Sequence, residues 1–199
     1  MIPAEHILRS KRITLSGPDE SDIDRIAQLC QDPAIQAWTT IPSPYSREDA
    51  RDFVSTAVLE GWRSGQSLNW AIRVIGASEL IGVIGFHSIA SRQGEVGYWL
   101  GSTHRGQGYL QEAIALVLDH GFAPSPFGLG LQRVVWHAFV GNTASAEVAR
   151  RQGFRFEGTA RLGGLQRGVR KDSWQAGLLA GDARTPVEGW PESTFVRTA

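Results

Sequence analysis

Apolar residues recur at three- and four-residue spacing in several parts of the chain, which is the pattern of amphipathic helices. The first segment is 19–32, and a second runs to about Arg63 from a capping box formed by Ser46 and Asp49. A third segment follows Gly108, and a fourth covers 142–153. The prolines in 37–46 predict a loop there.

Runs of β-branched and aromatic residues predict strands between these helices. They cover 12–16, 68–75, 79–89, 94–101, 131–140, 154–161 and 171–180. The resulting order is β-α-α-β-β-β-α-β-α-β-β, in which hairpins are interrupted by single helices. This order predicts the α+β class with a mixed, mostly antiparallel sheet. We expect one domain over 1–181 and a loose C-terminal tail over 182–199.

Composition narrows the choice of partners and compartment. The 199 residues include 20 Lys+Arg and 20 Asp+Glu, and this balance argues against nucleic acid or an anionic membrane as the main partner. Cys30 is the only cysteine, so no intrachain disulfide forms and we expect a cytoplasmic protein. No apolar run reaches the ~20 residues of a membrane span, and the first residues do not resemble a secretory signal. We also expect no metal site, because the five histidines show no ligand spacing.

The segment Arg105-Gly106-Gln107-Gly108 opens directly into a helix. A helix start exposes unpaired N–H groups and attracts anions, and glycine lets a phosphate approach closely. Four interpretations follow from the residues alone. The segment has neither the glycine spacing nor the lysine of a P-loop. It also lacks the third glycine of a dinucleotide-binding turn, because Gln111 stands at that position. An acyl-coenzyme A pyrophosphate site and a plain turn remain as interpretations.

Several stretches together resemble the GNAT superfamily of N-acetyltransferases, and most closely the ribosomal-protein N-acetyltransferases. Arg105–Leu110 is similar to the family's [QR]-x-x-G-x-[GA] motif at Arg105 and Gly108, and departs from it at Leu110. The strand EVGYWLG from Glu95 and the segment NTASAEVARRQGFRFEG from Asn142 also resemble the family. The resemblance covers about residues 10–180 in order and spacing.

This resemblance implies the GNAT fold, a twisted mixed sheet flanked by helices. It also implies transfer of an acetyl group from acetyl-CoA to a primary amine, a protein N-terminus or a small molecule, by direct attack in a ternary complex. Acetyl-CoA would be the co-substrate, no metal would be needed, and a homodimer is plausible. Two other classes stay open: a non-catalytic acyl-CoA-binding module on the same fold, and a nucleotide-binding protein.

The resemblance also implies roles for particular residues. Backbone amides of Arg105, Gly106, Gln107, Gly108, Tyr109 and Leu110 would hold the pyrophosphate, and Tyr98, Trp99 and Leu100 would bond the pantetheine arm through their main chain. Asn142 would bond the arm, and Ser145 would protonate the leaving thiolate, with Tyr109 as a rival acid. Our own candidate for the base is Glu95, because a bound ammonium must lose a proton and Glu95 opens the strand whose far end meets the cofactor. Each has a plainer interpretation: Asn142 as a helix cap, Ser145 as a small helix residue, Glu95 as a polar strand residue.

The acceptor side is the least defined by the sequence. By analogy, the segments 38–45 and 161–171 lie near the acceptor, and the second carries Arg161, Arg167, Arg170 and Lys171 around an expected hairpin turn. His87 and His137 stand in predicted strands. They either face the acceptor or are hydrogen-bonded core histidines.

Overall fold

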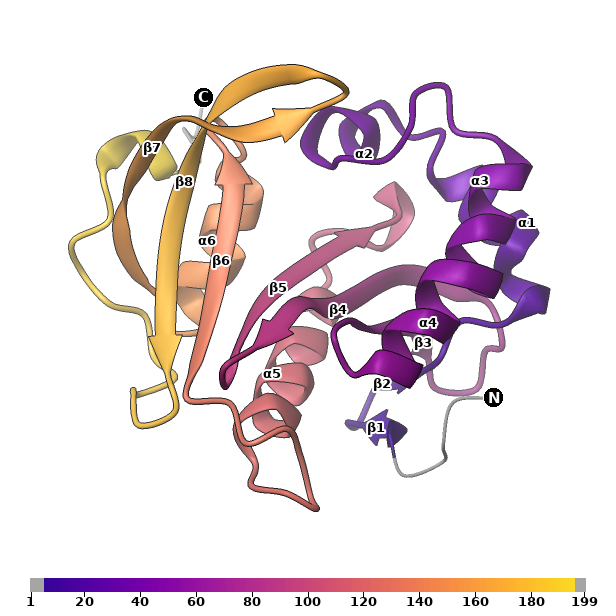
Figure 1. Ribbon diagram of the computed structural model, residues 1–199, viewed down its shortest axis with the longest axis horizontal. Coiled ribbons are helices and arrows are strands. Elements are labelled where there is room, and N and C mark those ends of the chain that lie inside the picture. The colour runs from indigo at the N-terminus through magenta and orange to yellow at the C-terminus, as the bar shows by residue number, and fades with distance from the viewer. Residues whose placement is uncertain (1–5, 196–199) are drawn as a thin grey trace.

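The computed structural model describes residues 6–195, in which eight strands form one twisted sheet (Figure 1). The strands follow the order β1-β2-β3-β4-β5-β6-β8-β7, and every neighbouring pair is antiparallel except β5 with β6. Their bounds are β1 (Leu8–Arg9), β2 (Ile13–Ser16), β3 (Leu68–Val74), β4 (Leu80–Ala90), β5 (Gln93–Leu100), β6 (Arg133–Phe139), β7 (Arg155–Gln166) and β8 (Val169–Leu179). The expected α+β class with a mixed, mostly antiparallel sheet is confirmed.

Helices cover both faces of this sheet, and each face has its own hydrophobic core. The helices are α1 (Ile23–Leu29), α2 (Pro33–Trp38), α3 (Arg47–Asp52), α4 (Leu59–Ser64), α5 (Tyr109–Phe122) and α6 (Thr143–Arg151). On one face, α5 and α6 pack on strand residues such as Trp70 and Phe86. On the other, α1, α2 and α3 pack on Ala71, Leu80 and Val83, which alternate along their strands with residues of the first core.

The sheet opens in its middle, between β5 and β6. These parallel strands pair only from Gln93–Glu95 to Arg133–Val135, and beyond these residues no further pairs join them. Figure 1 shows the two strands diverging from this short contact. Each keeps its outer neighbour, because β5 pairs with β4 as far as Leu100 and β6 pairs with β8 as far as Phe139.

One helix and one short strand differ from the sequence prediction. Residues 37–46 were expected to be a loop after a helix that stops before Pro33, but α2 begins at Pro33 and extends to Trp38. Asp32 caps it by accepting a hydrogen bond from Ala34 N at 2.8 Å, and Pro33 takes the first helical position, where its missing N–H costs nothing. The two-residue β1 was not predicted either.

The hairpin of β7 and β8 is longer than the sequence suggested. Its turn is only Arg167-Gly168, both with positive φ, so the strands run on through most of 161–171. Gly163 and Gly164, which look like turn residues, serve close packing instead. A Cβ on Gly164 would lie 2.6 Å from Phe139 Cε1.

The segment after Gly181 packs against the domain as far as it is described, rather than forming a loose tail. Trp190 is buried, donates from Nε1 to Phe154 O at 3.0 Å, and packs its ring on Trp136 and Phe156. Thr194 is buried as well. Residues 196–199 of the expected tail and residues 1–5 lie outside the described part of the chain.

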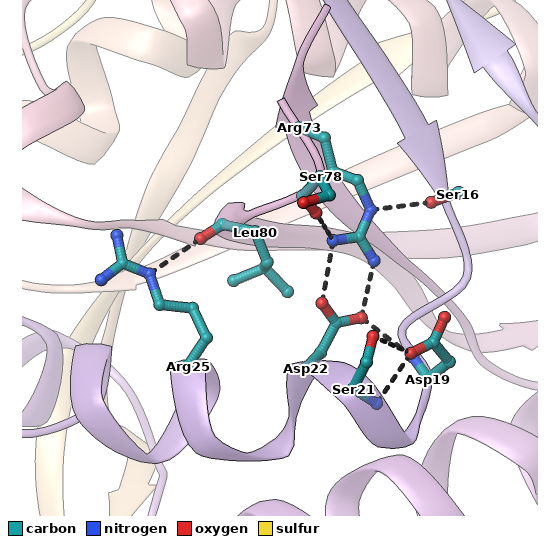
Figure 2. A network of polar contacts seen from close by, with 8 residues as sticks. All are labelled: Ser16, Asp19, Ser21, Asp22, Arg25, Arg73, Ser78 and Leu80. Carbon is teal, nitrogen blue, oxygen red and sulfur yellow. Dashed lines mark hydrogen bonds and ion pairs between the residues drawn. The ribbon is translucent and has the colours of Figure 1, made fainter. Parts of the chain in front are cut away.

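A buried ion pair ties the first helical segment to the sheet (Figure 2). The guanidinium of Arg73 on β3 donates to both carboxylate oxygens of Asp22, at 2.8 and 2.6 Å, and also to Ser16 Oγ and Ser78 O. The Asp22 side chain is 4% exposed and also accepts from Asp19 N. The Asp22 carboxylate therefore depends on the Arg73 charge to compensate its loss of water.

We predict that Arg73→Met lowers the free energy of unfolding by about 3–5 kcal/mol, because it leaves the Asp22 carboxylate buried without its cation. Urea unfolding measures the loss. Arg63→Met is the matched control, since Arg63 pairs with Glu60 on an open surface and should matter little. Equal effects of the two substitutions would contradict the role given to the buried pair.

Candidate active site

The glycine-containing turn between β5 and α5 presents a row of free backbone donors. Gly106 and Gly108 adopt φ of +74° and +82°, a left-handed conformation that favours glycine. The first helical hydrogen bond of α5 is Glu112 N to Gly108 O. Within the described residues, no group accepts a hydrogen bond from the N–H groups of 106–111. The turn therefore has the donors and the helix start that an anionic group requires.

Two arginines hold this turn in place. Arg105 donates to Leu100 O at 2.9 Å and to Asp32 Oδ2 at 2.7 Å, so its guanidinium is bound to the protein. Arg12 donates to Gln107 O at 2.9 Å, pairs with Glu112, and lies over the Tyr109 ring. Sequence analysis missed Arg12, because nothing near it in the sequence indicates that β2 lies beside a turn some hundred residues later.

A cavity of about 590 Å³, which we call the turn-side cavity, leads from this turn to the gap in the sheet. Among its lining residues are the predicted Tyr98, Trp99, Leu100, Arg105, Gly106, Gly108, Tyr109, Leu110, Asn142 and Ser145. The predicted Gln107 is not among them, since its side chain bonds Thr103 O and its carbonyl accepts from Arg12. The structure thus gathers these predicted residues, drawn from the end of β5, the turn and the starts of α5 and α6, around one space.

A second cavity of about 740 Å³, the strand-side cavity, lies on the sheet face that carries α1–α4. Glu95, His87 and His137 line it. The two cavities share the lining residues Trp38, Thr39, Tyr98, Trp99, Asn142 and Ser145. They therefore adjoin at the gap between β5 and β6, where molecules held in the two cavities can touch.

Ser145 stands at this junction within a small hydrogen-bond network. Its Oγ accepts from Trp136 Nε1 at 3.0 Å and donates to the Tyr98 hydroxyl at 3.1 Å, and that hydroxyl donates to Ser145 O. Burial raises the pKa of Tyr98 well above its ordinary value, so the phenol keeps its proton. Asn142 caps α6 by accepting from Ser145 N at 3.2 Å, which agrees with its plainer interpretation. The Tyr98 and Trp136 side chains were not predicted as partners of Ser145.

Glu95 lies between two histidines on the wall of the strand-side cavity. His137 Nδ1 on β6 is 3.1 Å from Glu95 Oε2, and His87 is the cross-strand partner of Glu95 on β4. The Glu95 carboxylate, through hydrogen bonding, raises the pKa of His137 despite its partial burial. Burial lowers the pKa of His87. These side chains come together because the β4–β5–β6 register places all three on the same face.

The two segments expected near the acceptor do lie together. Trp38, Thr39, Thr40 and Ile41 face Gly163, Gly164 and Leu165 across the strand-side cavity. The buried amide of Gln166 donates to Gln36 O, Ala37 O and Thr39 O, and Arg167 donates to Gln36 O and Ile41 O. The hairpin tip therefore binds the carbonyl groups at the end of α2, and Arg167 takes part in this contact. The helix missed in the sequence is what carries Trp38 to the junction.

Within residues 6–195, no cluster of three or more His, Cys, Asp or Glu side chains has the geometry of a metal site. Nor does that part of the chain contain a helix long and apolar enough to span a membrane.

Comparison with known proteins places this geometry among acetyltransferases. The family model described as "Acetyltransferase (GNAT) domain" matches residues 12–155. An uncharacterized N-acetyltransferase, p20 of Bacillus licheniformis, is 30% identical over 77% of this chain and 85% of its own. The ribosomal-protein-serine acetyltransferase of Escherichia coli K12 is 36% identical over 57% of this chain and 60% of its own.

A solved structure shows the same architecture with a ligand present. RimL, described as a ribosomal L7/L12 alpha-N-protein acetyltransferase in complex with coenzyme A, aligns with a TM-score of 0.77 and 25% identity. The alignment covers 87% of this chain and 98% of that one.

We predict that Gly108→Val weakens coenzyme A binding at least about tenfold, a loss of about 1.4 kcal/mol. The added side chain would strain the +82° φ and meet Arg12 Nη2, whose distance from a Cβ there is 3.1 Å. Isothermal titration calorimetry measures the affinity. Gly65→Val is the matched control, because Gly65 has φ +70° at the end of α4, with nothing within 4 Å of its Cβ position. Unchanged affinity of the Gly108 variant would contradict the pyrophosphate assignment.

Proposed function

The chain belongs to the acetyltransferase (GNAT) domain family, and from that membership we propose that this acetyl-CoA-dependent N-acetyltransferase modifies the N-terminal α-amine of a protein. The membership confirms the fold and the enzyme class that the sequence resemblance implied. One observation carries the proposal: two cavities adjoin at the sheet gap and share Ser145 in their lining. One would hold the acyl donor and the other the amine.

In the turn-side cavity, we place the pyrophosphate of acetyl-CoA on the free N–H groups of 106–111. The pantetheine arm would then lie along the inner edge of β5 at Tyr98–Leu100, which has no strand partner on that side. A ligand rich in amides can add itself to such an edge as a further strand. The arm would bring the thioester to Ser145 and Asn142.

The lining of the strand-side cavity favours an amine that has no carboxylate beside it. Glu95 is the carboxylate among its described lining residues, and no lysine or arginine is among them. A free amino acid would have to place its own carboxylate near Glu95 without a lysine or arginine to pair with it, which costs free energy. A protein N-terminus carries a neutral amide in that place. The relatives that act on ribosomal-protein N-termini are consistent with this choice.

The reaction needs a neutral amine and a protonated leaving group. A basic group at the Glu95 end of the cavity takes a proton from the bound ammonium. The amine nitrogen then attacks the thioester carbonyl, the carbon–sulfur bond breaks, and Ser145 gives a proton to the sulfur. Ser145 then regains a proton from solvent, while the buried Tyr98 keeps its own and accepts a hydrogen bond from Ser145 Oγ. The rest of the rate enhancement comes from holding the two reactants in contact.

We predict that a short peptide with an N-terminal serine is acetylated at its α-amine when incubated with the enzyme and acetyl-CoA. Mass spectrometry of the product locates the acetyl group. The controls are the same peptide with a blocked N-terminus and an internal lysine, free serine, and spermidine. Faster transfer to free serine, to spermidine or to the lysine side chain would contradict the α-amine proposal.

We predict that Ser145→Ala lowers kcat by about tenfold or more and changes the affinity for coenzyme A by less than about twofold, since a general acid typically contributes 10²–10⁴-fold. The reason is that Ser145 Oγ lies where the two cavities meet. Ser173→Ala is the matched control, because Ser173 lines only the strand-side cavity. Similar turnover of the two variants would remove Ser145 from the protonation step.

A further inference from the structure

Glu95 does not stand alone on the wall of the strand-side cavity. His137 Nδ1 reaches its carboxylate at 3.1 Å from β6, and both side chains are about one-third exposed to the cavity. No described residue hydrogen-bonds His137 Nε2, the other ring nitrogen, which leaves that atom available to a ligand. A carboxylate on one ring nitrogen and a free second nitrogen is the arrangement of a carboxylate–histidine base.

The proton of the acceptor matches a histidine better than a carboxylate. A protein α-amine has a pKa of about 7.7–8.0, and Glu has about 4.3, so transfer to Glu is unfavourable by about 10³-fold. An ordinary His has about 6.5, and the Glu95 carboxylate raises the pKa of His137 further. The difference in pKa from the amine is therefore smaller for His137 than for a carboxylate, and a smaller difference favours general-base catalysis near neutral pH.

We propose that His137 is the group that takes the proton from the acceptor amine, and that Glu95 orients His137 and stabilises the imidazolium it becomes. This inference deepens the proposed function and rests on it. In the step, an N–H bond of the ammonium breaks and a bond from that proton to His137 Nε2 forms. The neutral amine then attacks the thioester, and the imidazolium later gives the proton to solvent. Glu95 is a positioning residue in this scheme, and His137 is the catalytic one.

The charges around His137 support this assignment. Arg133 and Glu157 are the other charged groups acting on it, and they form a bidentate pair with each other at 2.8 and 2.6 Å, so their effects largely cancel. From β8, the neutral Gln175 is the strand partner of His137. Glu95 is thus the charge that sets the state of the imidazole.

His87 is a poor candidate for the same role although it flanks Glu95 on the other side. Burial lowers its pKa, its Nδ1 lies 3.3 Å from Ser67 Oγ, and its ring packs closely over Gly97. These contacts describe a neutral imidazole that forms part of the cavity wall. They make His87 the matched comparison for every substitution at His137.

The first test needs no acceptor. NMR titration of the histidine ring signals in the full-length protein should give His137 a pKa above 6.5, and Glu95→Gln should lower it. The same substitution should leave the pKa of His87 below 6.5. A His137 pKa at or below 6.5, or one that Glu95→Gln does not move, would overturn the pairing.

The second test measures transfer from acetyl-CoA to the N-terminal-serine peptide. His137→Ala should lower kcat/KM by about 10²–10⁴-fold, and added imidazole should restore part of the rate, whereas His87→Ala should lose less and gain nothing from imidazole. In Glu95→Gln, the rise of kcat/KM with pH should move to lower pH, because a less basic His137 becomes neutral at lower pH. The His137 base is wrong if His137→Ala keeps the wild-type rate within a few-fold.

The two tests separate the two proposals. A wild-type enzyme that binds acetyl-CoA but leaves the peptide unmodified contradicts the α-amine acceptor, and the titration then still decides whether Glu95 and His137 act as a pair. A wild-type enzyme that modifies the peptide, with His137→Ala unimpaired, supports the acceptor and rejects the base.

Discussion

The parting of β5 from β6 beyond Glu95 and Val135 is the constraint on which the rest of the structure depends. A buried strand edge normally leaves amides and carbonyls without partners, and proteins avoid this cost. Here the edge persists because β4 and β8 hold the two strands from outside while two cavities reach the gap. The opening is therefore a property of the sheet, and a ligand with amide groups of its own is the natural complement to it.

Because of its pleat, the short strand β5 would contact both reactants of the proposed reaction. Residues separated by an odd number of positions face opposite sides, so Glu95 faces the strand-side cavity and the Tyr98 side chain packs toward α6. The same alternation on β6 turns His137 toward Glu95 and Trp136 toward Ser145. The proposed base, His137, and Trp136, which holds the hydroxyl of the proposed acid Ser145, are thus adjacent residues of β6.

Features that depend on neighbouring residues were predictable from the sequence, whereas contacts between distant segments were not. The strands and the longer helices were predictable because their periodicity is local, and the turn at Gly106 and Gly108 was recognisable from the residues it needs. Helix α2 was missed because it has six residues and begins with proline, which looks like a break. Three contacts join segments that are far apart in the chain: that of Arg12 with the turn, that of His137 with Glu95 and that of Gln166 with the end of α2. Only strand register and hairpin length, which periodicity does not specify, bring them together.

The packing of Trp190 shows that the folded domain extends beyond the residues that match the family model. Its indole rests on that of Trp136, whose N–H holds the Ser145 hydroxyl, so the last described turn of the chain buttresses the place where the thioester would be broken. The family match stops at residue 155, thirty-five positions earlier. A domain boundary placed at residue 155 would take Trp190 away from the Trp136 ring. The described segment around Trp190 thus belongs to the packing that supports Ser145.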